Sequence, residues 1–144
     1  MKTPIVIACD HAGYDTKVLV IKHLSEMGYQ VLDLGTNSAE SVDYPEYGHK
    51  LGEKMESGNF ERGISICGSG NGINMVVNKH QGVRAAICWN VEISEMARRH
   101  NDANVCSIPA RYVDINETIK IIDTFLTTGF DGGRHERRKN KIDP

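Results

Sequence analysis

Residues 64–74 of the chain read Ile64-Ser65-Ile66-Cys67-Gly68-Ser69-Gly70-Asn71-Gly72-Ile73-Asn74. A short apolar run ends there on a cysteine, glycine then occupies every second position, and a helical pattern can follow. Such a run, bounded by turn residues, is consistent with a buried strand of a parallel sheet. Closely spaced glycines let backbone N–H groups point inward together, and at the start of a helix such groups form an anion-binding concavity. The stretch therefore predicts a strand, a turn and a helix, with a candidate site at the turn.

The same order of strand and helix recurs along the chain. Runs typical of strands lie at 4–9, 30–34, 63–67, 83–88 and 104–108. Helical patterns lie around 18–27, 45–57, from 73 onward, at 90–100 and from 114 or 116 to 126. Pro45 suits the first turn of its helix, and Asn90 is a candidate N-terminal cap. Strands alternating with helices predict an open, parallel, five-stranded sheet covered by helices on both faces. Without a linker or an internal repeat, we expect a single domain over residues 1–144.

Composition and charge exclude several classes of protein. The 144 residues carry a formal net charge of −2, with 25% charged and 40% hydrophobic residues, which indicates a globular domain and favours neither nucleic acid nor an anionic membrane as partner. No apolar run is long enough to span a bilayer, and the N-terminus lacks signal-peptide anatomy. The four cysteines, without a Cys-x-x-Cys pair, are typical of reduced cytosolic thiols; they are Cys9, Cys67, Cys88 and Cys106. We therefore expect a cytoplasmic protein.

The predicted fold also predicts where a ligand binds. In open parallel sheets, ligands bind beyond the carboxyl ends of the strands. The candidates are the polar or reactive residues that follow the first, third and fifth predicted strands: Asp10 and His11, then Cys67 with its glycine loop, then Pro109 and Arg111.

The glycine loop matches no nucleotide signature. A dinucleotide-binding loop would need glycine or alanine at position 73, a phosphatase loop would need arginine there, and the chain has Ile73. The Walker pattern lacks its Lys-Ser/Thr pair. Cys67 is the chemical candidate, because a helix N-terminus lowers the pKa of a thiol from about 8.5 toward neutrality. It could serve as nucleophile or general base, and the alternative is a tight turn with a buried cysteine.

Three other features have both a structural and a functional interpretation. Asp10-His11 is equally consistent with loop hydrogen bonding and with a site. His100 ends a helix, where the dipole favours a protonated imidazole suited to acid catalysis, anion binding or simple capping. The basic segment 131–144 is consistent with a solvated helix end, a subunit contact or phosphate binding, since Arg134 and Arg138 would share one helical face.

These residues together resemble ribose-5-phosphate isomerase of type B, a family that includes galactose-6-phosphate isomerase subunits. The resemblance covers nearly the whole chain and rests on the order and spacing of short motifs. They are Cys9-Asp10-His11-Ala12-Gly13, Asp43-Tyr44-Pro45, Cys67-Gly68-Ser69-Gly70-Asn71-Gly72, Asn78-Lys79, Arg84-Ala85, His100-Asn101-Asp102-Ala103-Asn104-Val105 and Gly132-Gly133-Arg134-His135 with Arg138.

The resemblance implies a Rossmann-like three-layer α/β/α sandwich. It implies interconversion of ribose 5-phosphate and ribulose 5-phosphate through an enediolate, with no metal or organic cofactor. It also implies a homodimer or a dimer of dimers with active sites shared between two subunits, and the segment 131–144 would pack at that interface.

By the same resemblance, Cys67 is the base that moves a proton between C2 and C1, and Ser69 supplies a hydroxyl. The loop residues expected to contact substrate are Gly68, Gly70, Asn71 and Gly72. Asp10 and His100 would assist ring opening. Phosphate would be bound by His11, Arg134 and Arg138, with Arg111 a further candidate, and the sugar would contact Tyr44 and Asn101. In the family, His100, Asn101 and the arginines come from the partner subunit.

Two departures and three alternatives accompany this interpretation. Ser69 replaces a common threonine but keeps the hydroxyl, and Asn71 stands where many relatives have an apolar residue. The alternative functions are isomerisation of a six-carbon sugar phosphate such as allose or galactose 6-phosphate, non-catalytic binding of a sugar phosphate, and flavodoxin-like nucleotide binding. Retention of Cys67, Asp10 and His100 together argues against mere binding.

Overall fold

The structure is a computed structural model that describes residues 2–144. Its elements follow in the order β1 (Ile5–Cys9), η1 (His11–Gly13), α1 (Tyr14–Glu26), β2 (Val31–Asp33), α2 (Tyr44–Glu56), β3 (Arg62–Cys67), α3 (Asn71–Val77), β4 (Ala85–Ile87), α4 (Val91–Asn101), β5 (Val105–Pro109), α5 (Ile115–Thr127) and α6 (Arg134–Lys139). The predicted alternation of strands and helices is confirmed.

The strands form one five-stranded sheet in the order β2-β1-β3-β5-β4, and every neighbouring pair is parallel. Because β1 lies inside the sheet, the chain leaves it toward β2 on one side and later reaches β3 on the other. Two loops at the carboxyl ends of β1 and β3 therefore diverge from adjacent strands, and this divergence creates the crevice in which ligands bind to such folds.

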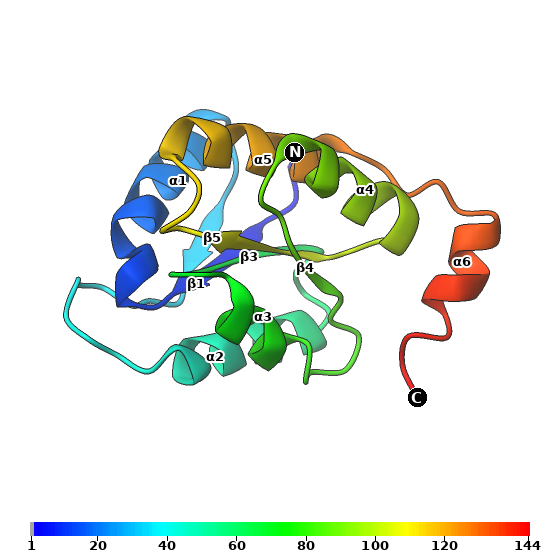
Figure 1. Ribbon diagram of the computed structural model, residues 1–144, viewed down its shortest axis with the longest axis horizontal. Helices are drawn as coiled ribbons and strands as arrows, with labels where there is room; N and C mark the ends of the chain where they lie inside the picture. Colours follow the sequence, from blue (N-terminus) through cyan, green and yellow to red (C-terminus); the bar gives the residue numbers. More distant parts are fainter. Residues whose placement is uncertain (1) are drawn as a thin grey trace.

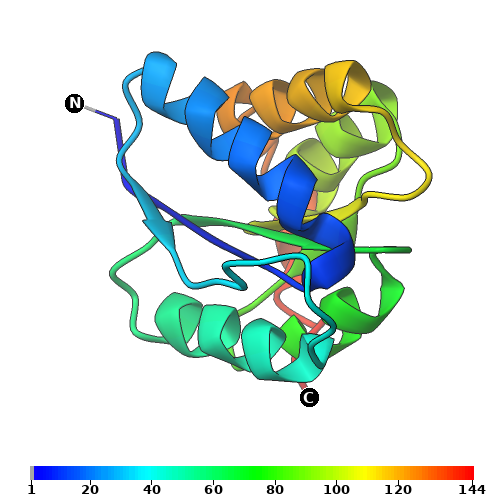
Figure 2. The ribbon, with the colours of Figure 1, turned by 90° about the vertical axis from the view of Figure 1, so that its left-hand side faces the viewer.

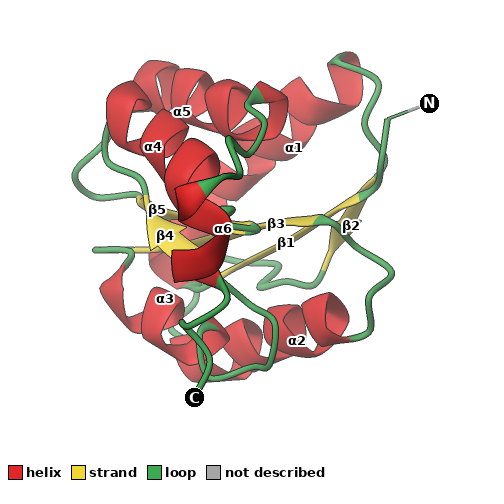
Figure 3. Ribbon diagram, turned by 90° about the vertical axis from the view of Figure 1, so that its right-hand side faces the viewer, coloured by secondary structure: helices red, strands yellow, loops and turns green. Residues whose placement is uncertain are grey.

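Helices cover both faces of the sheet, as predicted. Figure 1 shows α1, α4 and α5 on one face and α2 and α3 on the other, and Figure 2 shows the same three layers from the side. Figure 3 looks from the side on which α6 lies, in front of the sheet and outside both helical layers. This is a Rossmann-like α/β/α sandwich.

The strand β1 shows why the apolar runs are continuous. All five residues of Ile5–Cys9 have no exposed surface. Ile5, Ile7 and Cys9 pack into the core beneath α1, α4 and α5, whereas Val6 and Ala8 pack on the α2 side. A strand buried on both faces cannot alternate apolar with polar residues, which is why its sequence reads as an unbroken apolar segment.

Helix starts follow the predicted caps. The Asn90 side chain accepts a hydrogen bond from the Ile93 N–H at 2.8 Å, and Asp114, rather than Asn116, caps α5 through the Glu117 N–H at 2.9 Å. Pro45 lies in the first turn of α2. The predicted strands 30–34 and 83–88 were too wide, since β2 spans Val31–Asp33 and β4 spans Ala85–Ile87. At the start of β4, the Arg84 N–H donates to the Asn104 side chain instead of a neighbouring strand. No helix within residues 2–144 is long and apolar enough to cross a membrane.

The turn between β1 and α1 is held against β3 by close packing at Gly13. A Cβ on Gly13 would lie 2.6 Å from Ile66 Cγ2 and 2.9 Å from the Ile66 carbonyl oxygen. Because the neighbour includes backbone, Gly13→Ala is expected to destabilise the fold by about 1–3 kcal/mol through overpacking. The measurement is the midpoint of urea unfolding. Gly129→Ala is the matched control, since nothing lies within 4 Å of its Cβ; equal midpoints for the two variants would contradict the packing argument.

Candidate functional site

A cavity of about 330 Å³ opens at the carboxyl edge of the sheet. Its lining comes from the end of β3, from the loops that follow β1, β3 and β5, and from the starts of α2 and α3: Asp10, Tyr44, Cys67, Gly68, Ser69, Gly72, Arg111 and Tyr112. The sequence predicted all of these except Tyr112. The only sequence signal for Tyr112 was its position directly after Arg111, because tyrosine by itself does not distinguish a site from a surface.

The loop after β3 keeps its shape through its glycines. Gly70 has a φ of 76°, in the left-handed region that favours glycine. At Gly72 a Cβ would lie 2.5 Å from the Tyr44 ring, and at Gly68 a Cβ would lie 3.0 Å from Arg111 Nη1. Tyr44 and Arg111 thus pack directly on the loop backbone, which brings a phenol and a guanidinium to the cavity that Cys67 lines.

Buried hydrogen bonds fix the helix that follows this loop. Ser107 on β5 donates to Asn74 Oδ1 in α3 at 2.8 Å, so the 2.7 Å contact between the Ser65 and Ser107 hydroxyls has Ser65 as donor. Ser65 and Ser107 have no exposed surface. Their two hydrogen bonds connect α3 to β3 and β5. The loop between Cys67 and α3 is therefore held at both ends.

Cys67 differs from the other three cysteines. All four are free and buried, but Cys67 retains 4% exposure and lines the cavity. Burial raises the pKa of the Cys9 thiol to about 11 and raises that of Cys106 well above its ordinary value. Burial thus disfavours the thiolate at these two core positions, whereas Cys67 lines the cavity.

The side chains of Asp10 and His11 both accept hydrogen bonds from backbone N–H groups of loops. Asp10 Oδ1 accepts from the N–H groups of Ala12 at 2.9 Å and Gly13 at 3.2 Å, which fixes the carboxylate at the cavity wall. The Val42 N–H donates to His11 Nδ1 at 3.1 Å. A neutral His11 therefore carries its proton on Nε2. His11 follows Asp10 in η1 without lining the cavity itself.

Asn71 and Ser69 occupy the exposed lip of the loop. Ser69 Oγ accepts from the Asn71 N–H at 3.2 Å, and Asn71 is the first residue of α3. Asn71 does not line the cavity.

The remaining predicted residues lie elsewhere. His100 and Asn101 end α4, and Arg134 and Arg138 lie on α6. Because α4 runs back from the carboxyl edge, its last turn lies at the amino edge of the sheet. In Figure 1 the turn that begins α1 is at the left and α6 is at the right. Within a single chain, these four residues therefore lie away from the cavity that Cys67 lines.

A network of charges anchors this second group. Arg98 is 2% exposed and donates to Asp102 Oδ1 at 2.9 Å and to the Thr128 carbonyl at 3.1 Å. Arg84 and Lys139 also contact the Asp102 carboxylate. Partial burial opposes ionisation of Asp102, but the bond from Arg98 and the surrounding cations lower its pKa. The end of α4, which carries His100, is therefore fixed to α6.

Sequence reasoning missed His135, which stacks on His100. The ring centroids are 4.2 Å apart and the rings are within 7° of parallel. Desolvation, followed by the charges of His100 and Arg134, lowers the pKa of the His135 imidazole. Arg134 and Arg138 are exposed and, within residues 2–144, have no acidic side chain at salt-bridge distance. Their guanidinium groups remain available to an anion.

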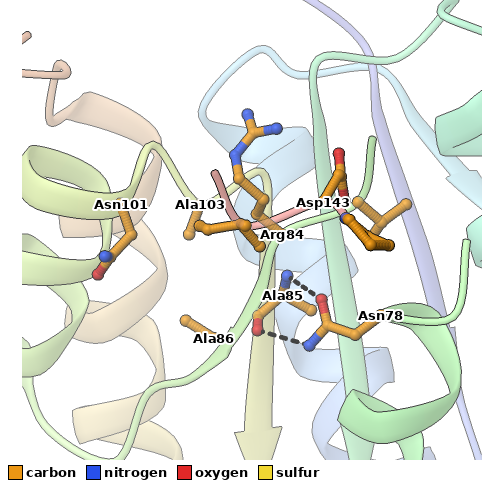
Figure 4. Close-up of a pocket in the computed structure, with 10 residues that line it drawn as sticks. Asn78, Arg84, Ala85, Ala86, Asn101, Ala103 and Asp143 are labelled. Atoms are coloured by element: carbon orange, nitrogen blue, oxygen red, sulfur yellow. Dashed lines mark hydrogen bonds between the residues drawn. The ribbon is translucent and has the colours of Figure 1, made fainter. Parts of the chain in front are cut away.

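A larger cavity, of about 400 Å³, lies at the amino edge between the ends of α3 and α4. Figure 4 shows Asn101 on one side of it and Asn78 on the other, with Ala85 bonded to the Asn78 amide. Arg84 and the C-terminal residues complete its wall. We assign the chemistry to the smaller cavity, because that one combines a thiol, a carboxylate, a guanidinium and glycine N–H groups, whereas Asn101 is the only predicted site residue in the larger one.

Comparisons with known proteins cover nearly the whole chain. A family profile described as ribose/galactose isomerase matches residues 5–142. A probable ribose-5-phosphate isomerase B of Mycoplasma pneumoniae is 44% identical over 99% of this chain and 94% of its own. A ribose 5-phosphate isomerase structure from Thermotoga maritima superimposes with a TM-score of 0.97 at 43% identity, covering 99% of both chains.

A third similar protein is ribose-5-phosphate isomerase B from Mycoplasma genitalium, whose structure contains bound ribulose-5-phosphate. It has a TM-score of 0.94 and 40% identity, covering 99% of this chain and 95% of its own. Profile, relatives and structures agree over the same residues. The chain therefore belongs to the ribose/galactose isomerase family.

Proposed function

We propose that this protein interconverts ribose 5-phosphate and ribulose 5-phosphate through an enediolate. The observation that carries the proposal is the cavity in which Cys67, Asp10 and Arg111 meet the glycine loop. Proteins similar over the whole chain are named ribose-5-phosphate isomerase B, and one of them holds ribulose-5-phosphate. A non-catalytic binding protein would have no need of a thiol at the cavity wall.

Proton transfer is assigned to Cys67. Aldose–ketose isomerisation moves a proton between C2 and C1, which requires one base near that edge of the sugar. In the direction from ribose to ribulose, Cys67 as thiolate takes the proton from C2 and as thiol returns it to C1. The hydroxyl proton of O2 passes to O1 in the same interconversion, so that the C1 aldehyde becomes a hydroxyl and the C2 hydroxyl becomes the carbonyl. The developing charge on the carbonyl oxygen needs preorganised donors, and the N–H groups of Gly68 and Gly70, with the Ser69 hydroxyl, are the donors we assign.

Ring opening precedes this step, because the furanose has no free carbonyl. It requires one group that takes the proton from the anomeric hydroxyl and one that protonates the ring oxygen. Asp10 and His100 are assigned to this pair, without a division of the two roles. Tyr44 and Asn101 are assigned to the sugar hydroxyls.

Phosphate binding is assigned to His11, Arg134 and Arg138, with Arg111 as a further donor. A neutral His11 has its Nε2 proton free to donate, since Nδ1 is already occupied. Arg134 and Arg138 lie four residues apart on α6, both exposed. A phosphate held there supplies binding energy remote from the reacting atoms, which can be used to orient the C1–C2 edge.

This assignment requires two copies of the chain. His100, Asn101 and the α6 arginines lie at the amino edge of the sheet, away from Cys67, so a second subunit must bring them to the cavity. We propose a homodimer, alone or within a dimer of dimers, in which residues 131–144 pack at the interface. A two-fold axis would create two identical shared sites.

A cytoplasmic location is also part of the proposal. Its support is the four free cysteines, since reduced thiols persist in a reducing compartment.

Replacing the proposed base tests the mechanism. Cys67→Ala should lower kcat by about 100-fold or more, the usual contribution of a general base, while ribose 5-phosphate still binds. The assay is release of the substrate C2 proton into solvent in the presence of EDTA, because the proposed steps use no metal ion. Cys88→Ala is the matched control, a buried cysteine that does not line the cavity. A fully active Cys67→Ala would disprove the assignment.

Mixing two inactive variants tests the shared site. Cys67→Ala and His100→Ala should each be inactive, but dimers formed from one subunit of each kind would contain one intact site. Refolding them together should restore roughly one quarter of the wild-type activity if subunits pair at random in a two-fold dimer. No recovery, with mixed dimers demonstrated by mass spectrometry, would place all catalytic groups in one subunit.

The identity of the sugar is tested by kcat/KM over a panel of pentose and hexose phosphates. We expect ribose 5-phosphate to exceed allose and galactose 6-phosphates by at least about tenfold, the size of effect that one extra carbon produces in a fitted pocket. A higher kcat/KM for a six-carbon substrate would transfer the assignment to the other branch of the family.

A further inference from the structure

Three possible metal ligands gather where α4 meets α6. His100 lies in the last turn of α4, His135 in the first turn of α6, and Asp131 in the segment between α5 and α6. Each offers one ligand atom, and the three atoms lie within 4.8 Å of one another. Of these residues only His100 has a role in the proposed isomerase.

The fold holds the three residues together independently of any ligand. The Asp131 N–H donates to the Arg99 carbonyl at 3.0 Å, so the segment is bonded to the end of α4. The Arg99 Nε donates to both Asp131 carboxylate oxygens, at 3.3 and 3.1 Å. The stacked His100 and His135 rings complete the arrangement. Residues distant in sequence are therefore preassembled.

We propose that His100, Asp131 and His135 form a binding site for a divalent transition metal such as Zn²⁺, and that an ion bound there inhibits the enzyme by occupying His100. The second half of this inference rests on the proposed function. The first half does not, because it concerns only the three ligands.

The donor set suits zinc. Two imidazoles and one carboxylate, with water as fourth ligand, make a tetrahedral site of common composition. In such a site the ligand atoms are roughly 3.3 Å apart, so the side chains must close around the ion. The two rings must also fan apart, because a metal lies in the plane of each imidazole that binds it. Within one subunit Asp131 is exposed and both histidines are partly exposed, so the chain itself leaves room for these rotations.

A second histidine cluster lacks this convergence. His80 Nε2 contacts His49 Nδ1 at 2.8 Å, while His80 Nδ1 contacts Glu56 Oε1 at 2.9 Å. The central ring uses opposite nitrogens toward its two neighbours, so the three side chains form a line rather than a cage. This cluster supplies the control for metal binding by surface histidines in general.

Neighbouring cations limit the affinity. Arg99 pairs with Asp131, and Arg134 adjoins His135 in the chain. Both repel a metal ion, so we expect weaker binding than at a structural zinc site with four protein ligands. An ion bound through the His100 nitrogen that serves in catalysis would still inhibit the enzyme, because a nitrogen that coordinates a metal has no lone pair with which to exchange a proton.

The first experiment titrates the full-length protein with ZnCl₂ in a calorimeter, without sugar phosphate. We expect one site per chain, weakened at least about tenfold in both His135→Ala and Asp131→Asn, a loss no smaller than that from mutating an outer-shell partner. His49→Ala and Cys67→Ala should bind as the wild type does. Binding that is lost in Cys67→Ala or His49→Ala, or retained in both His135→Ala and Asp131→Asn, would overturn the site. Thermal melts check that each variant is folded.

The second experiment measures isomerase activity against Zn²⁺ concentration, relative to the metal-free activity of each variant. Wild type should be inhibited over the concentration range in which it binds zinc and be restored by EDTA, and His135→Ala should need at least about tenfold more zinc. Zinc binding without inhibition of an active enzyme would overturn the inhibitory role alone. Zinc binding by a protein with no isomerase activity would instead refute the proposed function and leave the metal site standing.

Discussion

The turn at Gly70 is packed against the end of β5. A Cβ at this residue would lie 3.2 Å from the Pro109 nitrogen and 3.3 Å from the Ile108 carbonyl carbon, both of which are backbone atoms. With a φ of 76° as well, the position tolerates glycine alone. On the other side of the contact, the N–H groups of Ala110 and Arg111 donate to the carbonyls of Cys67 and Gly68 at 2.9 and 3.0 Å. Backbone contacts between two adjacent strand ends thus fix the loop.

That constraint explains why the cavity combines residues from distant parts of the chain. The order β1-β3-β5 within the sheet places three loops side by side at one edge. The loop after β1 brings Asp10, the loop after β3 brings Cys67, and the loop after β5 brings Arg111. A chain that ran β3-β4-β5 in order would put a different loop next to the thiol. The insertion of β5 between β3 and β4 is therefore a condition for the site, and not only a feature of the fold.

Much of this was predictable from local sequence, and the reasons differ by residue. Ile5–Cys9 was readable as a strand because burial on both faces demands an apolar run. The carboxyl-edge rule then located Asp10, Cys67 and Arg111 without knowledge of the strand order. The strand order itself depends on nonlocal pairing and leaves no local pattern. The stacking of His135 on His100 could not be predicted either, because it too depends on contacts between residues distant in sequence. The burial of Lys17 could not be predicted either, because a lysine in a helix is normally solvated. Lys17 is 1% exposed, and its ammonium donates to Asp33 Oδ1 and to the Thr36 carbonyl, both at 2.6 Å.

The two roles proposed for His100, in ring opening and in metal binding, would compete with each other. A group that assists ring opening must be accessible to substrate and must keep a free nitrogen lone pair. The same two properties make an imidazole a metal ligand, and here a second imidazole and a carboxylate lie within reach. Arg99, Arg134 and Arg138 oppose that outcome, since the positive field that attracts a phosphate repels a metal ion. In the proposed site, the cationic surface formed by Arg99 on α4 and by Arg134 and Arg138 on α6 would therefore serve discrimination as well as binding. It would raise the local concentration of an anionic substrate and lower that of the cations that could compete for His100.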